Sequence, residues 1–344
     1  MVATILSRVF GLVREMGIAY IFGVSGKTDA FYLAFNIPEL IRTLVISGVL
    51  SSIFIPIFAG FREKKSLDEA KRVTAELFSF TALIAVGTVI VGMIFAPNVI
   101  WLAKAISFRS GDPEIIKNAI RLTRILFPML IFISLSGLVQ GILNSVHNYK
   151  TPAFAPLYFN IVIIGILLGF KITDPEFNNI DILAYAVVIG TFIQFAVQLP
   201  ALKYHGFTLL KIPNFQHEAF VKFRELAPAA MLGYATMVVN SFVDKSIAFG
   251  MIPGGGITTL WLGFRIQQIP YSVFGVTLVT VLFPIIAQHI AAKRFDDLKV
   301  ALDRGIRVLA FTLIPSFKGV FVSWKLKKTL ERSSSEAPGK IPSV

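Results

Sequence analysis

The residues best suited to chemistry lie in one apolar stretch, from Ser7 to Arg42. This stretch reads as two apolar segments joined by a Gly/Ser turn. A charge near the centre of a bilayer costs roughly 2.5–3.5 kcal/mol on insertion scales, so charged side chains in such segments are expected to share a polar interior. They predict helices that line a water-filled or ion-paired space rather than lipid. The six charged residues of the two segments are Arg8, Arg14, Glu15, Asp29, Glu39 and Arg42.

The composition of the chain places these segments in a membrane. Its 344 residues are 55% hydrophobic and 15% charged, with a mean hydropathy of +0.73, which is typical of integral membrane proteins. Because the sequence has no cysteine, it excludes disulfides and Cys-ligated metals. A basic rim beside anionic headgroups accounts for most of the net charge of +13, so nucleic acid is not an expected partner.

Hydropathy predicts eight complete membrane spans and the start of a ninth. The loops on the side of the N-terminus carry 15 Lys and Arg residues, whereas the alternate loops carry 5. The positive-inside rule therefore predicts a cytoplasmic N-terminus. The predicted spans are residues 3–24, 29–60, 73–96, 118–146, 152–170, 182–202, 226–250, 257–291 and 300–316.

Two short motifs predict an internal repeat. YLAFNI at Tyr32–Ile37 resembles WLGFRI at Trp261–Ile266, and IPIF at Ile55–Phe58 resembles FPII at Phe283–Ile286. The two pairs are separated by almost the same length of chain, so one short gap aligns them. Because six spans precede the second copy, the two copies enter the membrane in the same direction. The predicted fold is an all-α polytopic membrane protein with two parallel-repeat helical lobes around a central cavity. The second lobe is incomplete, and the whole chain is predicted to have eight to nine transmembrane helices.

Changes in composition predict four domains along the chain. Residues 1–202 form a six-helix N-terminal lobe, residues 203–224 a cytoplasmic linker, and residues 225–316 a partial second lobe. Residues 317–344 are basic and rich in Ser, Pro and Gly, which predicts an aberrant or disordered tail. A frameshift or premature end would produce such a tail, and a natural basic tail is the alternative.

Several motifs in a fixed order resemble the MviN/MurJ family of bacterial lipid II flippases, within the multidrug/oligosaccharidyl-lipid/polysaccharide superfamily. The resemblance covers residues 1 to about 316, so it implies a chain truncated near that point. It also implies a multi-pass protein of the bacterial cytoplasmic (inner) membrane that moves an undecaprenyl-pyrophosphate-linked peptidoglycan precursor to the outer leaflet by alternating access. The motifs are SRVFGLVRE (Ser7–Glu15), IFG with TDAF (Ile21–Phe31), PELIR (Pro38–Arg42), LNSVHNYKTPAFAP (Leu143–Pro156) and FRIQQIPYSVFGVTLVTVLFP (Phe264–Pro284).

The resemblance also implies which residues line the cavity. Glu15 stands where many members have Asp, and Gln268 stands where some have Glu. Cations in or beside the spans outnumber acids, and a surplus of guanidinium groups suits a pyrophosphate because Arg donates bidentately to phosphate oxygens. The predicted cavity and substrate-binding residues are Arg8, Arg14, Glu15, Asp29, Arg42, Arg124, Arg265 and Gln268.

The alternative for each Arg is a structural pair with an acid or a carbonyl. Neighbouring residues of a helix point in different directions, so Arg14 and Glu15 are not expected to meet, and Glu15 is expected to meet Arg42 or Arg265. Lys245, like its neighbour Asp244, is expected to snorkel at the outer end of its span.

The sequence thus predicts a lipid II flippase without enzymatic activity, cofactor or metal site. The expected partners are lipid II and membrane lipids, and a coupling ion is left open. A related polysaccharide-lipid or drug exporter and an inactive truncated product are the alternatives. The four histidines, at His147, His205, His217 and His289, have no metal-ligand spacing.

Overall fold

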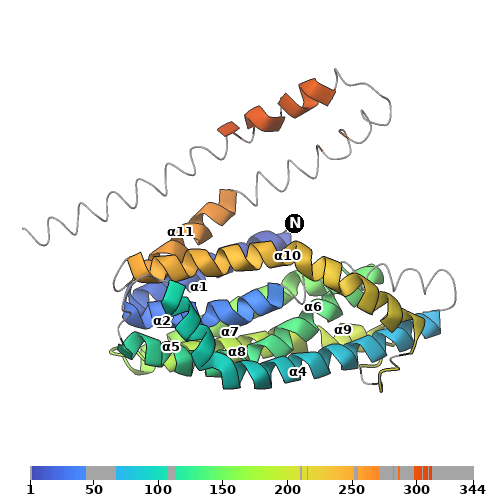
Figure 1. Cartoon of the computed structure of the whole chain (residues 1–344), viewed down its shortest axis with the longest axis horizontal. Helices are drawn as coiled ribbons and strands as arrows, with labels where there is room; N and C mark the ends of the chain where they lie inside the picture. Colours follow the sequence, from blue (N-terminus) through green and yellow to red (C-terminus); the bar gives the residue numbers. More distant parts are fainter. Residues whose placement is uncertain are drawn as a thin grey trace, which may run out of the picture. The chain divides into compact units, whose positions relative to one another are not determined.

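The computed structural model describes most of the chain up to Pro270 and short pieces beyond it. In this part of the chain every regular element is a helix and there is no strand, so the all-α prediction is confirmed (Figure 1). Predictions for the tail at 317–344 lie outside the described residues. The described residues are 2–43, 67–106, 113–209, 211–214, 216–251, 255–270, 282, 286, 298–303, 305–308 and 310–311.

Ten labelled helices carry the fold (Figure 1). The bend between α5 and α6 measures 43° and falls at Pro128, as its missing N–H predicts. The helices are α1 (Val2–Phe22), α2 (Gly26–Arg42), α4 (Leu67–Ile106), α5 (Pro113–Leu126), α6 (Met129–Ser145), α7 (Lys150–Thr173), α8 (Ile180–Ala196), α9 (Leu199–Tyr204), α10 (Glu218–Met251) and α11 (Gly256–Pro270).

Four described segments are long and apolar enough to cross a membrane, and the bent pair α5–α6 makes a fifth if it counts as one span. They lie in α4, in α7, in α8 with α9, and in α10, and they agree with predicted spans. α1 carries three charged residues, and much of the second, eighth and ninth predicted spans lies outside the described residues. The predicted total of eight to nine helices is therefore only roughly supported.

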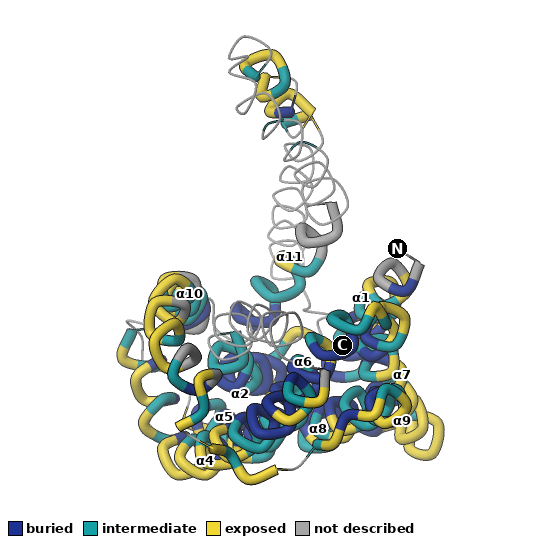
Figure 2. Tube along the Cα trace, turned by 90° about the vertical axis from the view of Figure 1, so that its right-hand side faces the viewer, coloured by how far each residue is buried: buried dark blue, intermediate teal, exposed yellow. Residues whose placement is uncertain are grey.

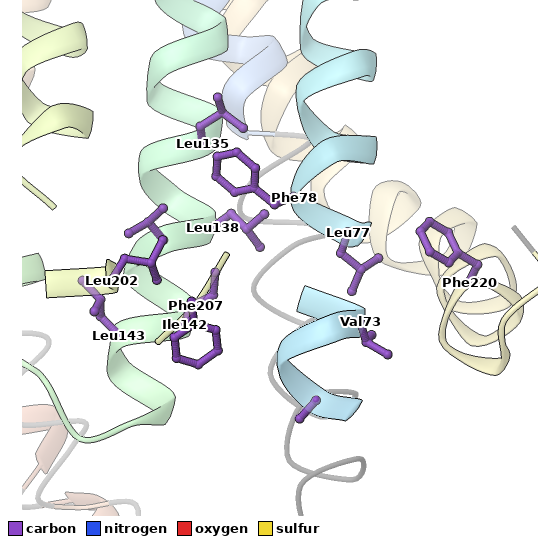
Figure 3. Packing of buried hydrophobic residues seen from close by; sticks show 12 residues of the cluster. Val73, Leu77, Phe78, Leu135, Leu138, Ile142, Leu143, Leu202, Phe207 and Phe220 are labelled. Carbon is purple, nitrogen blue, oxygen red and sulfur yellow. The ribbon is translucent and has the colours of Figure 1, made fainter. Parts of the chain in front are cut away.

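One apolar cluster joins α4, α6 and α9 (Figure 3). Leu77 and Phe78 of α4 pack with Leu138 of α6, and two residues of the predicted linker, Phe207 and Phe220, are buried in the same cluster. The linker backbone is also anchored, because the amide of Asn214 donates to Glu76 Oε2 (3.4 Å) and the amide of Lys211 to Ser79 Oγ (3.0 Å). Residues 203–224 are thus fastened to the first six-span region.

The helix ends support the internal repeat. α1 ends at Phe22 and α10 ends at Met251, while α2 begins at Gly26 and α11 begins at Gly256. The length of chain between the members of each pair nearly equals that between Tyr32 and Trp261 of the matched motifs. The turns between these helices contain Gly23 (φ 65°) and Gly255 (φ 123°), which adopt backbone angles that side chains disfavour. Helix ends therefore recur at nearly the same spacing in the two copies.

The chain forms two compact units, Met1–Leu260 and Trp261–Val344. In the first unit, α10 packs against α2 and α4, so this boundary falls later than the predicted ones at 202 and 225. The division into two lobes stays a prediction. Figure 2 shows that buried residues concentrate in α2, whereas α4 and α10 carry many exposed ones.

Candidate functional site

α2 is the helix on which the candidate site of the first unit is built. Its residues from Thr28 to Pro38 are nearly all buried. Asp29, Tyr32 and Asn36 are spaced by three and four residues, so they follow one side of the helix. Each of the three bonds to a different helix, so α2 is a centre of buried polar contacts in the first unit.

The first contact is a buried network between α1, α2 and α7. Arg14 and Glu15 of α1 form an ion pair, with only 7% and 2% of each residue exposed. Arg14 Nη1 donates to Asn160 Oδ1 at 3.0 Å, and Tyr32 Oη donates to Glu15 Oε2 at 2.8 Å. The guanidinium carbon of Arg14 also lies 5.2 Å from the ring centroid of Phe159. A carboxylate and a guanidinium are thus held together away from lipid.

This network overturns one prediction. Arg14 and Glu15 were expected to point apart, with Glu15 meeting Arg42 or Arg265, but they pair with each other. The Cα–Cβ bonds of neighbouring helical residues diverge, but both side chains are long enough for the guanidinium to reach the carboxylate. One buried donor of this group, Arg14 Nε, has no hydrogen-bond partner among the described residues.

The second contact joins Asp29 of α2 to the first turn of α11. Asp29 Oδ2 accepts from the Gly255 amide (2.6 Å), and Oδ1 accepts from the Thr258 amide (2.9 Å) and from Thr258 Oγ1 (2.7 Å). The carboxylate therefore caps helix α11 from outside and meets the positive end of its dipole. Asp29 and Thr258 are as far apart in sequence as Tyr32 and Trp261 of the matched motifs, so the repeat makes the two positions equivalent.

The third contact joins Asn36 of α2 to Lys245 of α10. Lys245 Nζ donates to Asn36 Oδ1, and the two residues are 9% and 1% exposed. The prediction that Lys245 snorkels is therefore wrong: the side chain turns inward to α2, while its neighbour Asp244 is exposed. Hydropathy could not reveal this, because adjacent residues of one helix end can face opposite environments.

Three other predicted site residues do not enter these buried contacts. Arg42 is half-buried and pairs with Glu39 on its own helix, with Nε 2.8 Å from Oε2. Arg124 is exposed and donates to the Met93 carbonyl at 3.3 Å. Arg8 is exposed and has no hydrogen-bond or ion-pair partner within the described part of the chain.

The two remaining predicted residues belong to the second unit. The guanidinium carbon of Arg265 lies 4.9 Å from the ring centroid of Trp261, one turn earlier on α11. Gln268 falls within α11, but its side chain lies outside the described residues. Among the described residues, no group of three or more His, Cys, Asp or Glu side chains could hold a metal ion.

Four residues that make these buried contacts are not among the site residues predicted from the sequence. They are Asn160, Lys245, Tyr32 and Thr258. Asn160 carries a signal, because it is a strongly polar side chain in a span without charge. Lys245 carries a different signal, a charge inside a predicted span, which is interpreted as snorkelling. Tyr32 and Thr258 carry none, since both types are common in ordinary membrane helices. Their roles appear only when the helices are brought together.

Comparison with known proteins shows what the chain resembles. The family model described as "Lipid II flippase MurJ" matches residues 18–327, which extends past the limit of about 316 expected from the motifs. The chain is 32% identical over 330 residues to a probable lipid II flippase MurJ of Buchnera aphidicola subsp. Acyrthosiphon pisum, covering 94% of this chain and 62% of the relative. It is 30% identical over 332 residues to the lipid II flippase MurJ of Burkholderia cenocepacia, covering 92% and 61%. The chain thus spans about three fifths of the length of these curated relatives.

Solved structures give the same fold. One titled "Lipid II flippase MurJ, inward closed conformation" matches with a TM-score of 0.72 and 26% identity, over 92% of this chain and 63% of the other. An inward-facing multidrug resistance MATE transporter matches with a TM-score of 0.71, over 89% and 68%, but at 14% identity this likeness shows the fold alone. With its apolar helices, the chain is a multi-pass protein of the bacterial inner membrane.

Proposed function

This chain belongs to the MurJ family of lipid II flippases, and we propose that it moves lipid II from the inner to the outer leaflet by alternating access. The observation that carries the proposal is the burial of Arg14, Glu15, Asp29 and Lys245 inside apolar helices. Such charges are expensive in a bilayer and mark a pathway for a polar substrate. The function is transport, without covalent chemistry on the substrate.

The cations suit the pyrophosphate of lipid II better than any other part of the substrate. Arg stays charged when it is desolvated and binds phosphate oxygens in a planar, forked geometry. Arg14 offers a buried Nε without a partner among the described residues. Arg8 lies seven residues before Glu15, about 10 Å along the helix, and is exposed. We propose that Arg8 and Arg42 receive the pyrophosphate near the entrance and that Arg14 binds it further in.

The orientation of the chain gives these residues a direction. With the N-terminus in the cytoplasm, as the loop charges predict, α1 runs outward, and the turn between α1 and α2 lies near the outer surface. Arg8 and Arg42 then lie toward the cytoplasm and Asp29 toward the outside. The contact of Asp29 with α11 closes the outer end, which is consistent with the likeness to an inward closed structure.

A drug exporter is the competing function, because the fold is shared with MATE transporters. The cation surplus disfavours it, since a cationic drug would be repelled by the arginines that a pyrophosphate attracts. The decisive substrate property is therefore negative charge.

The proposal is tested in vesicles that contain the purified chain. Fluorescent lipid II is placed in the lipid, and its exposure on each leaflet is followed with a membrane-impermeant quencher. Lipid II should exchange between the leaflets faster in vesicles that contain the chain than in vesicles without protein. Imposed sodium gradients and membrane potentials, applied one at a time, show whether a sodium gradient or the potential drives the exchange. Transport of a cationic drug without movement of lipid II would overturn the proposal, as would no movement of either.

A further inference from the structure

The function proposed above counts Lys245 among the buried charges but gives its contact with Asn36 no role of its own. Lys245 Nζ donates to Asn36 Oδ1, and both side chains are at least nine-tenths buried. The amide nitrogen of the same Asn36, Nδ2, is buried and has no hydrogen-bond partner among the described residues. A buried donor without a partner is unfavourable, and it indicates a site where an acceptor is bound at another stage of the protein's cycle.

The repeat indicates what that acceptor is. In the alignment of YLAFNI with WLGFRI, Asn36 occupies the position of Arg265, which is one of the residues predicted to bind pyrophosphate. The first copy thus has a neutral amide where the second copy has a guanidinium. Lys245, whose equivalent in the first copy is Met16 by the same alignment, supplies a positive charge to this position from α10.

We propose that Lys245 and Asn36 form an additional anion subsite that binds a phosphate oxygen of the lipid-linked pyrophosphate, with Nζ as the charged donor and Asn36 Nδ2 as the neutral one. This inference rests on the proposed function and adds a residue to it. The subsite lies on the same side of α2 as Tyr32 and Asp29, one turn from Tyr32. A phosphate there would satisfy Nδ2 and would weaken the bond between α2 and α10 as it binds.

The test measures binding of lipid II to the purified chain in detergent, with undecaprenol as the uncharged comparison. Lys245→Met nearly keeps the length of the side chain and removes its charge, so it should weaken lipid II binding about 10- to 100-fold, the effect of losing one charge-assisted hydrogen bond. Lys104→Met is the matched control, because Lys104 lies at the end of α4 over Trp101 (4.7 Å). It should leave the affinity unchanged.

A double variant separates charge from packing. Asn36→Lys combined with Lys245→Met moves the cation across the same contact, from α10 to α2, and should restore most of the affinity. Thermal melting confirms that each variant is folded. Lys245→Arg keeps the charge and should also keep most of the affinity for lipid II. If both this variant and the swap bind lipid II as weakly as Lys245→Met, Lys245 acts in helix packing and the inference is overturned.

The two proposals fail in different ways. If the unaltered chain binds lipid II and Lys245→Met binds it equally well, the subsite is wrong and the flippase proposal stands. If the unaltered chain binds lipid II no better than undecaprenol, the proposed function itself fails, and the subsite fails with it.

Discussion

Asp29 and Thr258, which the internal repeat makes equivalent, are bonded directly to each other, with the Thr258 amide 2.9 Å from Asp29 Oδ1. One buried carboxylate thus holds the N-terminal ends of α2 and α11 together. A movement that separates these two helix ends has to break this contact.

Replacing Asp29 should loosen this junction. Asp29→Ala removes the acceptor for two amides and one hydroxyl, and loss of a helix cap costs about 0.5–2 kcal/mol. The variant should melt at a lower temperature in detergent than the unaltered chain. Asp174→Ala, which removes an exposed acceptor for the Glu176 amide, is the control and should change melting less. Equal melting of both variants would contradict the capping role.

A disulfide across the junction should stop transport. Thr28 Oγ1 and Thr258 Oγ1 are 3.0 Å apart, and the sequence has no other cysteine to interfere. The double variant Thr28→Cys and Thr258→Cys should lose lipid II exchange under oxidising conditions and regain it with a reductant. Each single variant serves as a control. Full transport with the crosslink verified by mass spectrometry would show that this end need not open.

The hydroxyl of Tyr32 should stabilise the buried Glu15. Tyr32→Phe removes the 2.8 Å bond to Glu15 Oε2 and leaves that oxygen in a buried site, so it should lower the free energy of unfolding by about 1–3 kcal/mol. Tyr20→Phe makes the same chemical change at a residue that is 82% exposed, and it should have no measurable effect. Denaturation followed by circular dichroism compares the two. Equal denaturation curves for Tyr32→Phe and Tyr20→Phe would show that the Tyr32 hydroxyl does not stabilise Glu15.

Two glycines of α4 should respond in opposite directions to alanine. A Cβ at Gly92 would come within 2.0 Å of the Phe127 ring, so Gly92→Ala should destabilise the fold by about 1–3 kcal/mol. A Cβ at Gly87 would meet nothing within 4 Å, so Gly87→Ala should stabilise the helix by about 0.5–1 kcal/mol. The melting temperatures of the two variants are compared. A higher melting temperature for Gly92→Ala than for Gly87→Ala would contradict the close packing of Gly92 on Phe127.

The sequence predicts those features that depend on local pattern. Apolar runs predict the helices, Pro128 predicts the bend between α5 and α6, and the matched motifs predict the repeat that the ends of α1 and α10 support. Polar contacts depend instead on how a side chain bends. The Arg14–Glu15 pair was not predicted, because helical geometry describes Cβ directions and not the reach of a guanidinium.

The candidate site is predictable in its residue types more than in its contacts. That Asp29 lines a cavity stays a prediction, and the structure adds that its carboxylate accepts hydrogen bonds from the N-terminus of α11. That contact depends on two segments that lie far apart in the sequence, so no local pattern reveals it. Lys245 was assigned to the surface because it lies near a span end. Only the packing of α10 on α2 shows that its amine is buried.

The central claim is that a buried cation next to α2 acts on the pyrophosphate of lipid II. The most direct measurement compares the rate of lipid II exchange in vesicles for Arg14→Gln and for Arg72→Gln, an exposed arginine paired with Glu76. With both variants inserted and folded, exchange should fall at least about tenfold for Arg14→Gln, as expected for the loss of a charge-assisted hydrogen bond, and stay unchanged for Arg72→Gln. Exchange at the full rate by Arg14→Gln would contradict the account.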